Sequence, residues 1–174
     1  MENKDFKKLL FKTAFCVMAC DGSIDDLEIQ EMRKIDSSTT YFSDIDLSDE
    51  LDELINELHN KNIKIVKNLF DSLRENTLTI SQELLILEVT MRIINADDVI
   101  DDNEVRFLNL IRSKLDLGNQ IIHQRFGKIS YLKNLNYEDV GISQSDFINA
   151  CTEILKSDIY NFLVDKNYEL LWSG

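Results

Sequence analysis

The chain has 174 residues, a formal net charge of −13, five glycines and no proline. This length suits one domain with a small appendage. The negative charge argues against a sequence-independent nucleic-acid surface and against a polybasic membrane patch, since both need clustered Lys and Arg. Hydrophobic residues make up 44% of the chain, and without proline nothing forces the backbone to break. The composition therefore predicts an all-α protein with a real core.

The first predicted element is a helix over residues 6–19, apolar on nearly every side, as is typical of a helix in the middle of a domain. Its apolar run ends in Val-Met-Ala-Cys, which also resembles a lipoprotein cleavage site. Acidic Glu2 and Asp5 and the interrupting Lys12 disfavour a signal. No run in the sequence is long and apolar enough to predict a membrane-spanning helix.

The segment CDGSIDDLE, residues 20–28, looks like the middle of an EF-hand loop. Placing Gly22 at loop position six would make Val17 and Ala19 ligands, which excludes an EF-hand because a hydrophobic helix occupies those positions. We instead expect Gly22 to end the first helix in a left-handed conformation. We expect Asp25 to cap a second, amphipathic helix through the N–H of Glu28, whose side chain reaches back.

The middle of the chain predicts three more helices. Apolar spacing indicates helices over 48–58 and 63–73, and a buried helix over 84–96 that begins after the cap residue Thr79. The stretch 35–60 contains acidic residues and no Lys or Arg. It is either a solvated surface or a docking site for a basic partner.

An internal repeat appears at an offset of 76 residues, the separation of Asp21 and Asp97. Residues 9–35 then align with residues 85–111, matching both acidic and apolar positions. Each copy reads as a buried helix, an acidic turn and an amphipathic helix. Asp98 stands where the first copy has Gly22, and Asp tolerates the same left-handed conformation. Lys12 aligns with Glu88, so the two either pair across the core or both reach solvent at its edge. Glu88 can also pair with Arg92 along its helix.

The C-terminal part begins after Gly118, which breaks the helical pattern before a short helix that ends at Phe126. We divide the chain into a helical domain over residues 1–126 and an extension over residues 127–174. The extension predicts a helix at about 144–157 that Ser143 caps. Residues 161–172 predict a β-hairpin, with a fraying helix as the alternative.

The reactive side chains do not indicate an enzyme. Cys16, Cys20 and Cys151 read as small core residues in a reducing compartment, and a soft-metal or redox pair at Cys16 and Cys20 is the alternative. The sequence has no nucleophile–base arrangement and no glycine-rich phosphate loop. The predicted function is therefore binding rather than catalysis.

The two acidic turns are the candidate site. Brought together, they would offer oxygen ligands suited to Ca²⁺, Mg²⁺ or Mn²⁺. In the alternative reading, the same acids only cap helices, since capping uses some of the carboxylate lone pairs. The candidate metal ligands are Asp21, Asp25, Glu28, Asp97, Asp101 and Glu104.

The paired motifs CDGSIDDLE and ADDVIDDNE, each after an apolar helix, resemble the tellurite-resistance TerB family, whose motif Ala-Asp-Gly-x-Ile/Val-x-x-x-Glu occurs twice. The resemblance covers about residues 5–125, and Asp98 and Cys20 depart from the motif. It implies a bundle of about seven helices with a divalent-metal site at the same six acids. It also implies a cytoplasmic bacterial protein that acts through protein partners, some of them at the inner membrane, in stress or defence systems covering tellurite, phage and colicin resistance.

Overall fold

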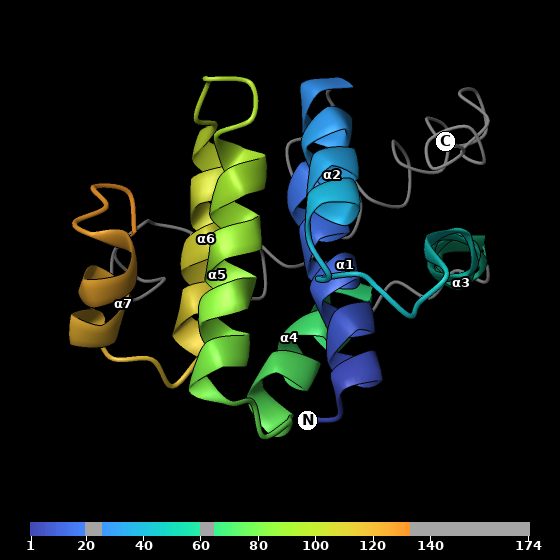
Figure 1. Ribbon diagram of the computed structural model, residues 1–174, viewed down its shortest axis with the longest axis horizontal. Coiled ribbons are helices and arrows are strands. Elements are labelled where there is room, and N and C mark those ends of the chain that lie inside the picture. Colours follow the sequence, from blue (N-terminus) through green and yellow to red (C-terminus); the bar gives the residue numbers. More distant parts are fainter. Residues whose placement is uncertain (20–25, 60–64, 133–174) are drawn as a thin grey trace.

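The structure is a computed structural model, and it describes residues 1–19, 26–59 and 65–132. Within these residues the chain forms seven α-helices and no strand, which confirms the predicted all-helical fold (Figure 1). The predicted C-terminal helix at 144–157 and the hairpin or fraying helix at 161–172 lie outside the described residues. The helices are α1 (Asn3–Ala19), α2 (Asp26–Ser38), α3 (Leu47–His59), α4 (Ile65–Glu75), α5 (Ile80–Ile94), α6 (Asp102–Lys114) and α7 (Asn119–Phe126).

Helices α1 and α5 form the centre of the bundle. They pack against each other more extensively than any other pair of described helices, and they run in the same direction (Figure 1). Both are buried on several sides, as their all-round apolar sequences predict. Two buried threonines in them do not leave a hydroxyl unsatisfied: Thr13 donates to the Leu9 carbonyl at 2.7 Å and Thr90 to the Ile86 carbonyl at 2.8 Å. Hydroxyls that bond back along the helix allow polar residues in this core.

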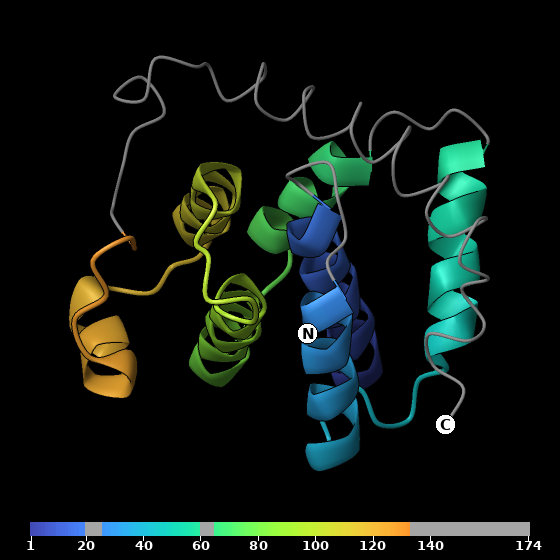
Figure 2. The ribbon, with the colours of Figure 1, turned by 90° about the horizontal axis from the view of Figure 1, so that it is seen from above.

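The other helices cover this pair with their apolar faces. Helix α2 packs on α5, α3 on α1, α4 on α1 and α6, and α6 on both central helices. Seen from above, α3 stands on one side of α1 and α7 on the far side of α5 (Figure 2). Aromatic contacts tie the layers together, since the Phe11 and Phe42 rings meet edge to face at 5.8 Å and the Phe70 and Phe107 rings lie 5.3 Å apart.

The helix ends follow the predicted caps where the structure describes them. Thr79 accepts a hydrogen bond from the N–H of Gln82, and the Gln82 side chain accepts one from the N–H of Thr79, forming a capping box before α5. Helix α5 therefore begins at Ile80, directly after the predicted cap residue, and its apolar stretch from residue 84 follows one turn later. It ends at Ile94 because Asn95 serves as its C-cap. Asp98 has a φ of 60°, as predicted for the residue aligned with Gly22.

Among the described residues, no helix has both the length and the apolar content that crossing a membrane requires.

Candidate functional site

The predicted metal ligands lie in or next to the two acidic turns. Asp21 and Asp25 fall in residues 20–25, outside the described residues. The other four belong to the start of α2 and to the α5–α6 loop with the start of α6. Figures 1 and 2 show that these segments lie at the same end of the bundle, because α1 and α5 run in parallel. We call residues 26–28 and 97–104 the acidic end.

The α5–α6 loop is built around two carboxylates that accept backbone hydrogen bonds. Oδ1 of Asp97 accepts from the N–H of Val99 at 3.1 Å. Oδ1 of Asp101 accepts from the N–H groups of Asn103 at 2.7 Å and Glu104 at 3.3 Å, which makes Asp101 the N-cap of α6. One oxygen of each carboxylate therefore holds the turn, as the capping hypothesis predicts.

Glu28 and Glu104 differ from these two carboxylates in burial. Each is the third residue of its helix, and each is only 1% exposed. A carboxylate at that position lies beside the positive end of the helix dipole, which offsets part of the cost of its burial. The repeat predicts that Glu28 and Glu104 occupy equivalent positions. It does not predict their burial, because a glutamate in the first turn of a helix usually lies at the surface.

The described residues contain no group of three or more His, Cys, Asp or Glu side chains already arranged around a metal position. Two of the six predicted ligands, Asp21 and Asp25, lie outside that part of the chain.

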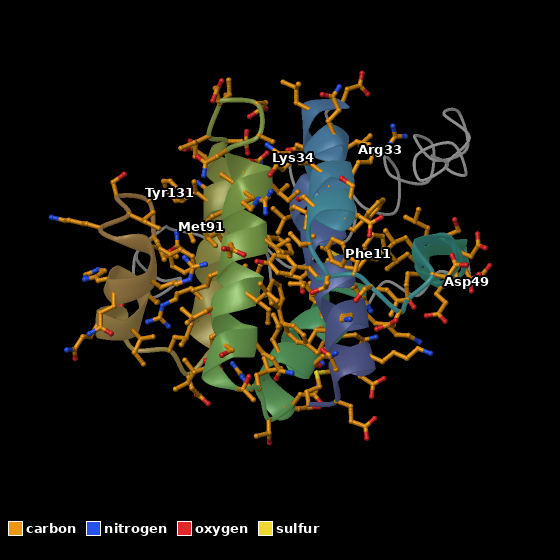
Figure 3. The ribbon with its side chains drawn as sticks, viewed as in Figure 1. Phe11, Arg33, Lys34, Asp49, Met91 and Tyr131 are labelled. Carbon is orange, nitrogen blue, oxygen red and sulfur yellow. The ribbon has the colours of Figure 1, made fainter. Side chains whose placement is uncertain are left out.

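A second site lies in a groove of about 440 Å³ between α2, α5 and α7, which we call the α5 groove. Figure 3 shows Met91 on the side of α5 that faces α7, where Tyr131 also lies. The Asn95 side chain donates to the Tyr131 hydroxyl at 2.9 Å. The groove is lined by Glu31, Glu88, Met91, Arg92, Asn95, Ala96, Arg125 and Phe126.

Two ion pairs span the α5 groove, and each joins a charged side chain of α5 to a side chain of another helix. Arg92 Nε lies 2.8 Å from Glu31 on α2, and Glu88 lies 2.7 Å from an Arg125 guanidinium nitrogen on α7. The Arg125 guanidinium also lies over the Phe126 ring, 5.1 Å from its centroid. The expected pairing of Glu88 with Arg92 along α5 is replaced by these bonds between elements, which attach α2 and α7 to the central helix.

The Tyr41 hydroxyl completes this network by donating to Glu88 at 2.6 Å. The hydrogen bond to Glu88, followed by partial burial, raises the pKa of the Tyr41 phenol. Neither Tyr41 nor Arg125 was connected with Glu88 by sequence reasoning, because they are 47 and 37 residues away from it. No local periodicity could have revealed these partners.

A smaller cavity of about 220 Å³ lies between α1, α3 and α4. Lys8 Nζ is 3.6 Å from Glu50 there. Lys12 lines this cavity, whereas its aligned residue Glu88 lines the α5 groove. Burial, and then repulsion from Glu53, raise the pKa of Glu50. Both acidic and basic side chains line this cavity, and they come from α1 and α3.

Comparison of the chain with protein-family models, with curated proteins and with solved structures finds no match.

Proposed function

We propose that the chain is a non-catalytic TerB-like module that binds a divalent cation through its paired acidic turns. It would act as an interaction or sensing component of a bacterial stress-response or defence system, of the kind that confers tellurite, phage or colicin resistance. The observation that carries this proposal is the position of the acidic end: the start of α2 and the α5–α6 loop lie at one end of the bundle (Figures 1 and 2).

The chemistry of these turns supports a hard cation. All six candidate ligands are carboxylates, and Ca²⁺, Mg²⁺ and Mn²⁺ prefer oxygen ligands. Asp97 and Asp101 each use one oxygen for backbone bonds, and each carboxylate has a second oxygen. The pseudo-twofold repeat belongs to the same proposal, since Glu28 and Glu104 occupy the same position in their helices and are equally buried.

A structural adaptor is the second candidate function, and a specific observation favours it. Asp101 accepts two backbone hydrogen bonds, and Asp97 holds the loop through the N–H of Val99. Caps of this kind are sufficient reason for an acid in a helix-starting turn. In this reading the acids shape a protein-binding bundle and hold no metal.

In both readings we place the protein in the bacterial cytoplasm, acting through protein partners, some of them at the inner membrane. The expectation that it is not an enzyme belongs to the proposal too. Its support is that the sequence contains no nucleophile–base arrangement and no glycine-rich phosphate loop.

Calorimetry separates the two readings. Ca²⁺, Mg²⁺ and Mn²⁺ are titrated into the wild type, into the double variant Asp21→Asn with Asp97→Asn, and into the control Asp49→Asn. Asp49 is an exposed carboxylate on α3, away from the acidic end (Figure 3). The metal reading expects binding heat in the wild type and the control and its loss in the double variant. Absence of heat at millimolar metal would leave the adaptor reading.

A further inference from the structure

Three of the four large hydrophobic side chains that are exposed among the described residues lie at the acidic end. Val99 is 65% exposed, Leu27 is 46% exposed and Ile100 is 43% exposed. Leu27 belongs to the first turn of α2, and the other two form the middle of the α5–α6 loop. Single exposed apolar residues need no explanation, but several at one end of a molecule mark an interaction surface.

The chain segments that carry these side chains are acidic, and the first basic residues of α2 are Arg33 and Lys34. Residues 95–104 contain five acidic residues and no Lys or Arg, and residues 19–32 also contain five acidic residues and no Lys or Arg. Asp26, Asp98 and Asp102 are themselves exposed at the acidic end. An apolar centre surrounded by charged groups is the usual anatomy of a protein interface.

We infer that the acidic end is a docking surface for a basic amphipathic segment of a partner protein, with Leu27, Val99 and Ile100 as its apolar contacts. The charge selects this occupant. A second copy of the chain would bring two acidic surfaces together, and anionic lipid headgroups or nucleic-acid phosphates would be repelled. A helix with Leu and Lys on adjoining faces satisfies both the apolar centre and the acidic surround.

This inference rests on the proposed function only in that the chain acts through partners. It does not require the cation. Val99 and Ile100 would contact the partner through apolar surface, and the carboxylates would attract a basic partner without bound metal. Running the test in EDTA therefore keeps its outcome separate from that of the metal titration.

The probe is an 18-residue synthetic peptide of Leu and Lys, with Leu at the i, i+3, i+4, i+7 spacing of one helix face and a fluorescent label. Its anisotropy is measured against the full chain in EDTA at two salt concentrations. We expect saturable binding to the wild type. Val99→Ser with Ile100→Ser should weaken it by at least about tenfold, since burying two such side chains is worth more than that factor.

Two controls separate a specific surface from general attraction to an acidic protein. Ile80→Ser removes the fourth exposed hydrophobic side chain, 57% exposed at the opposite end of α5, and should leave the affinity unchanged. Asp98→Asn with Asp102→Asn should weaken binding and reduce its salt dependence. Asp49→Asn with Asp116→Asn removes two exposed charges elsewhere, and it should change the affinity and the salt dependence much less.

Four results would overturn the inference. The first is no binding of the peptide. The second is equal affinity for the wild type and the Val99→Ser, Ile100→Ser variant, which means attraction by net charge alone. The third is self-association of the chain that this variant abolishes, which means that a second copy occupies the surface. The fourth is variant-sensitive binding to phosphatidylserine vesicles, which means that the surface contacts a membrane.

Discussion

The Tyr41 hydroxyl donates a 2.6 Å hydrogen bond to Oε2 of Glu88, while Oε1 of the same carboxylate pairs with Arg125 at 2.7 Å. Glu88 thus joins the segment after α2, the central helix α5 and the short helix α7. Each partner is far from Glu88 in sequence, so the three segments are held together by one side chain on the edge of the core.

Replacing Tyr41 by Phe tests this junction. The variant loses a hydrogen bond to a charged group, and we expect its free energy of unfolding to fall by about 1.5–3 kcal/mol. Urea denaturation below pH 9 measures the loss. As a control, Tyr131→Phe removes a hydroxyl that is hydrogen-bonded to the neutral Asn95 side chain, and it should cost less.

The pH dependence of the same contact has a defined sign. The bond to Glu88 raises the pKa of the Tyr41 phenol, so the folded state holds its proton more tightly than the unfolded chain does. The stabilisation is fully present below the ordinary phenol pKa and is lost as the pH rises through the folded value. We expect the wild-type advantage over Tyr41→Phe to shrink above about pH 10. An advantage that stays constant there would contradict the bond.

Glu83 predicts a pH effect on the acid side. It is 6% exposed, and its Oε1 accepts from the N–H of Asp116 at 3.0 Å. Burial is the main cause that raises its carboxyl pKa, against the opposing effects of the Asp116 N–H and Arg112. A carboxyl with a raised folded pKa favours folding more as the pH falls through that value, because the native state binds the proton more strongly.

We therefore expect Glu83→Gln to be more stable than the wild type at pH 7, since Gln keeps a carbonyl for the Asp116 N–H and needs no buried charge. This difference should shrink as the pH is lowered toward 4, when Glu83 takes up its proton. Thermal unfolding at several pH values measures it. Glu75→Gln, an exposed glutamate on α4, serves as the control and should show a smaller change with pH. A wild type that is more stable at pH 7 would contradict the argument.

The contribution of the α6 N-cap to stability can be measured at Asp101. Asp101→Ala leaves the N–H groups of Asn103 and Glu104 without their acceptor, and should cost about 1 kcal/mol of stability. Asp101→Asn keeps an acceptor oxygen and should cost less. Chemical denaturation in EDTA compares the two variants without any contribution from metal. If Asn and Ala were equally destabilising, the charge and not the hydrogen bonds would be the important property.

The left-handed backbone conformation of Asp98 limits which residues the position tolerates. Its φ of 60° suits Gly and, among other residues, Asp and Asn. Asp98→Gly should keep the stability of the wild type, whereas Asp98→Val should lose about 1–2 kcal/mol, because a β-branched side chain crowds the backbone there. Asp98→Asn is the matched control and should behave as the wild type. Equal stability of the Val and Gly variants in urea denaturation would rule out strain at this position.

Much of the fold could be predicted from the sequence because it depends on near neighbours. Helix spacing, the capping box at Thr79 and the left-handed Asp98 involve residues within about four positions of each other, and the composition favours helices. The helix ends were less accurate: the predicted buried helix runs to residue 96, whereas α5 ends at Ile94 because Asn95 is its C-cap.

The candidate site was predictable only in part, for a related reason. That Asp101 caps α6 follows from the order of residues in one turn. Whether Glu28 and Glu104 are buried depends on what packs over them, and the sequence contains no signal for it. The exposure of Leu27, Val99 and Ile100 is likewise a tertiary fact, because an apolar residue in a turn is as compatible with a core as with a surface.

By itself, the sequence determined the helical class, the acidic turns and the residues that end and begin helices, because these depend on the local backbone and its nearest side chains. Only the tertiary structure decided that the two described parts of those turns share one end of the bundle and that Glu88 binds Tyr41 and Arg125. The parallel packing of α1 on α5 is the physical reason for the first. Glu88 reaches Tyr41 and Arg125 because the fold brings together segments that lie 37 or more residues apart along the chain.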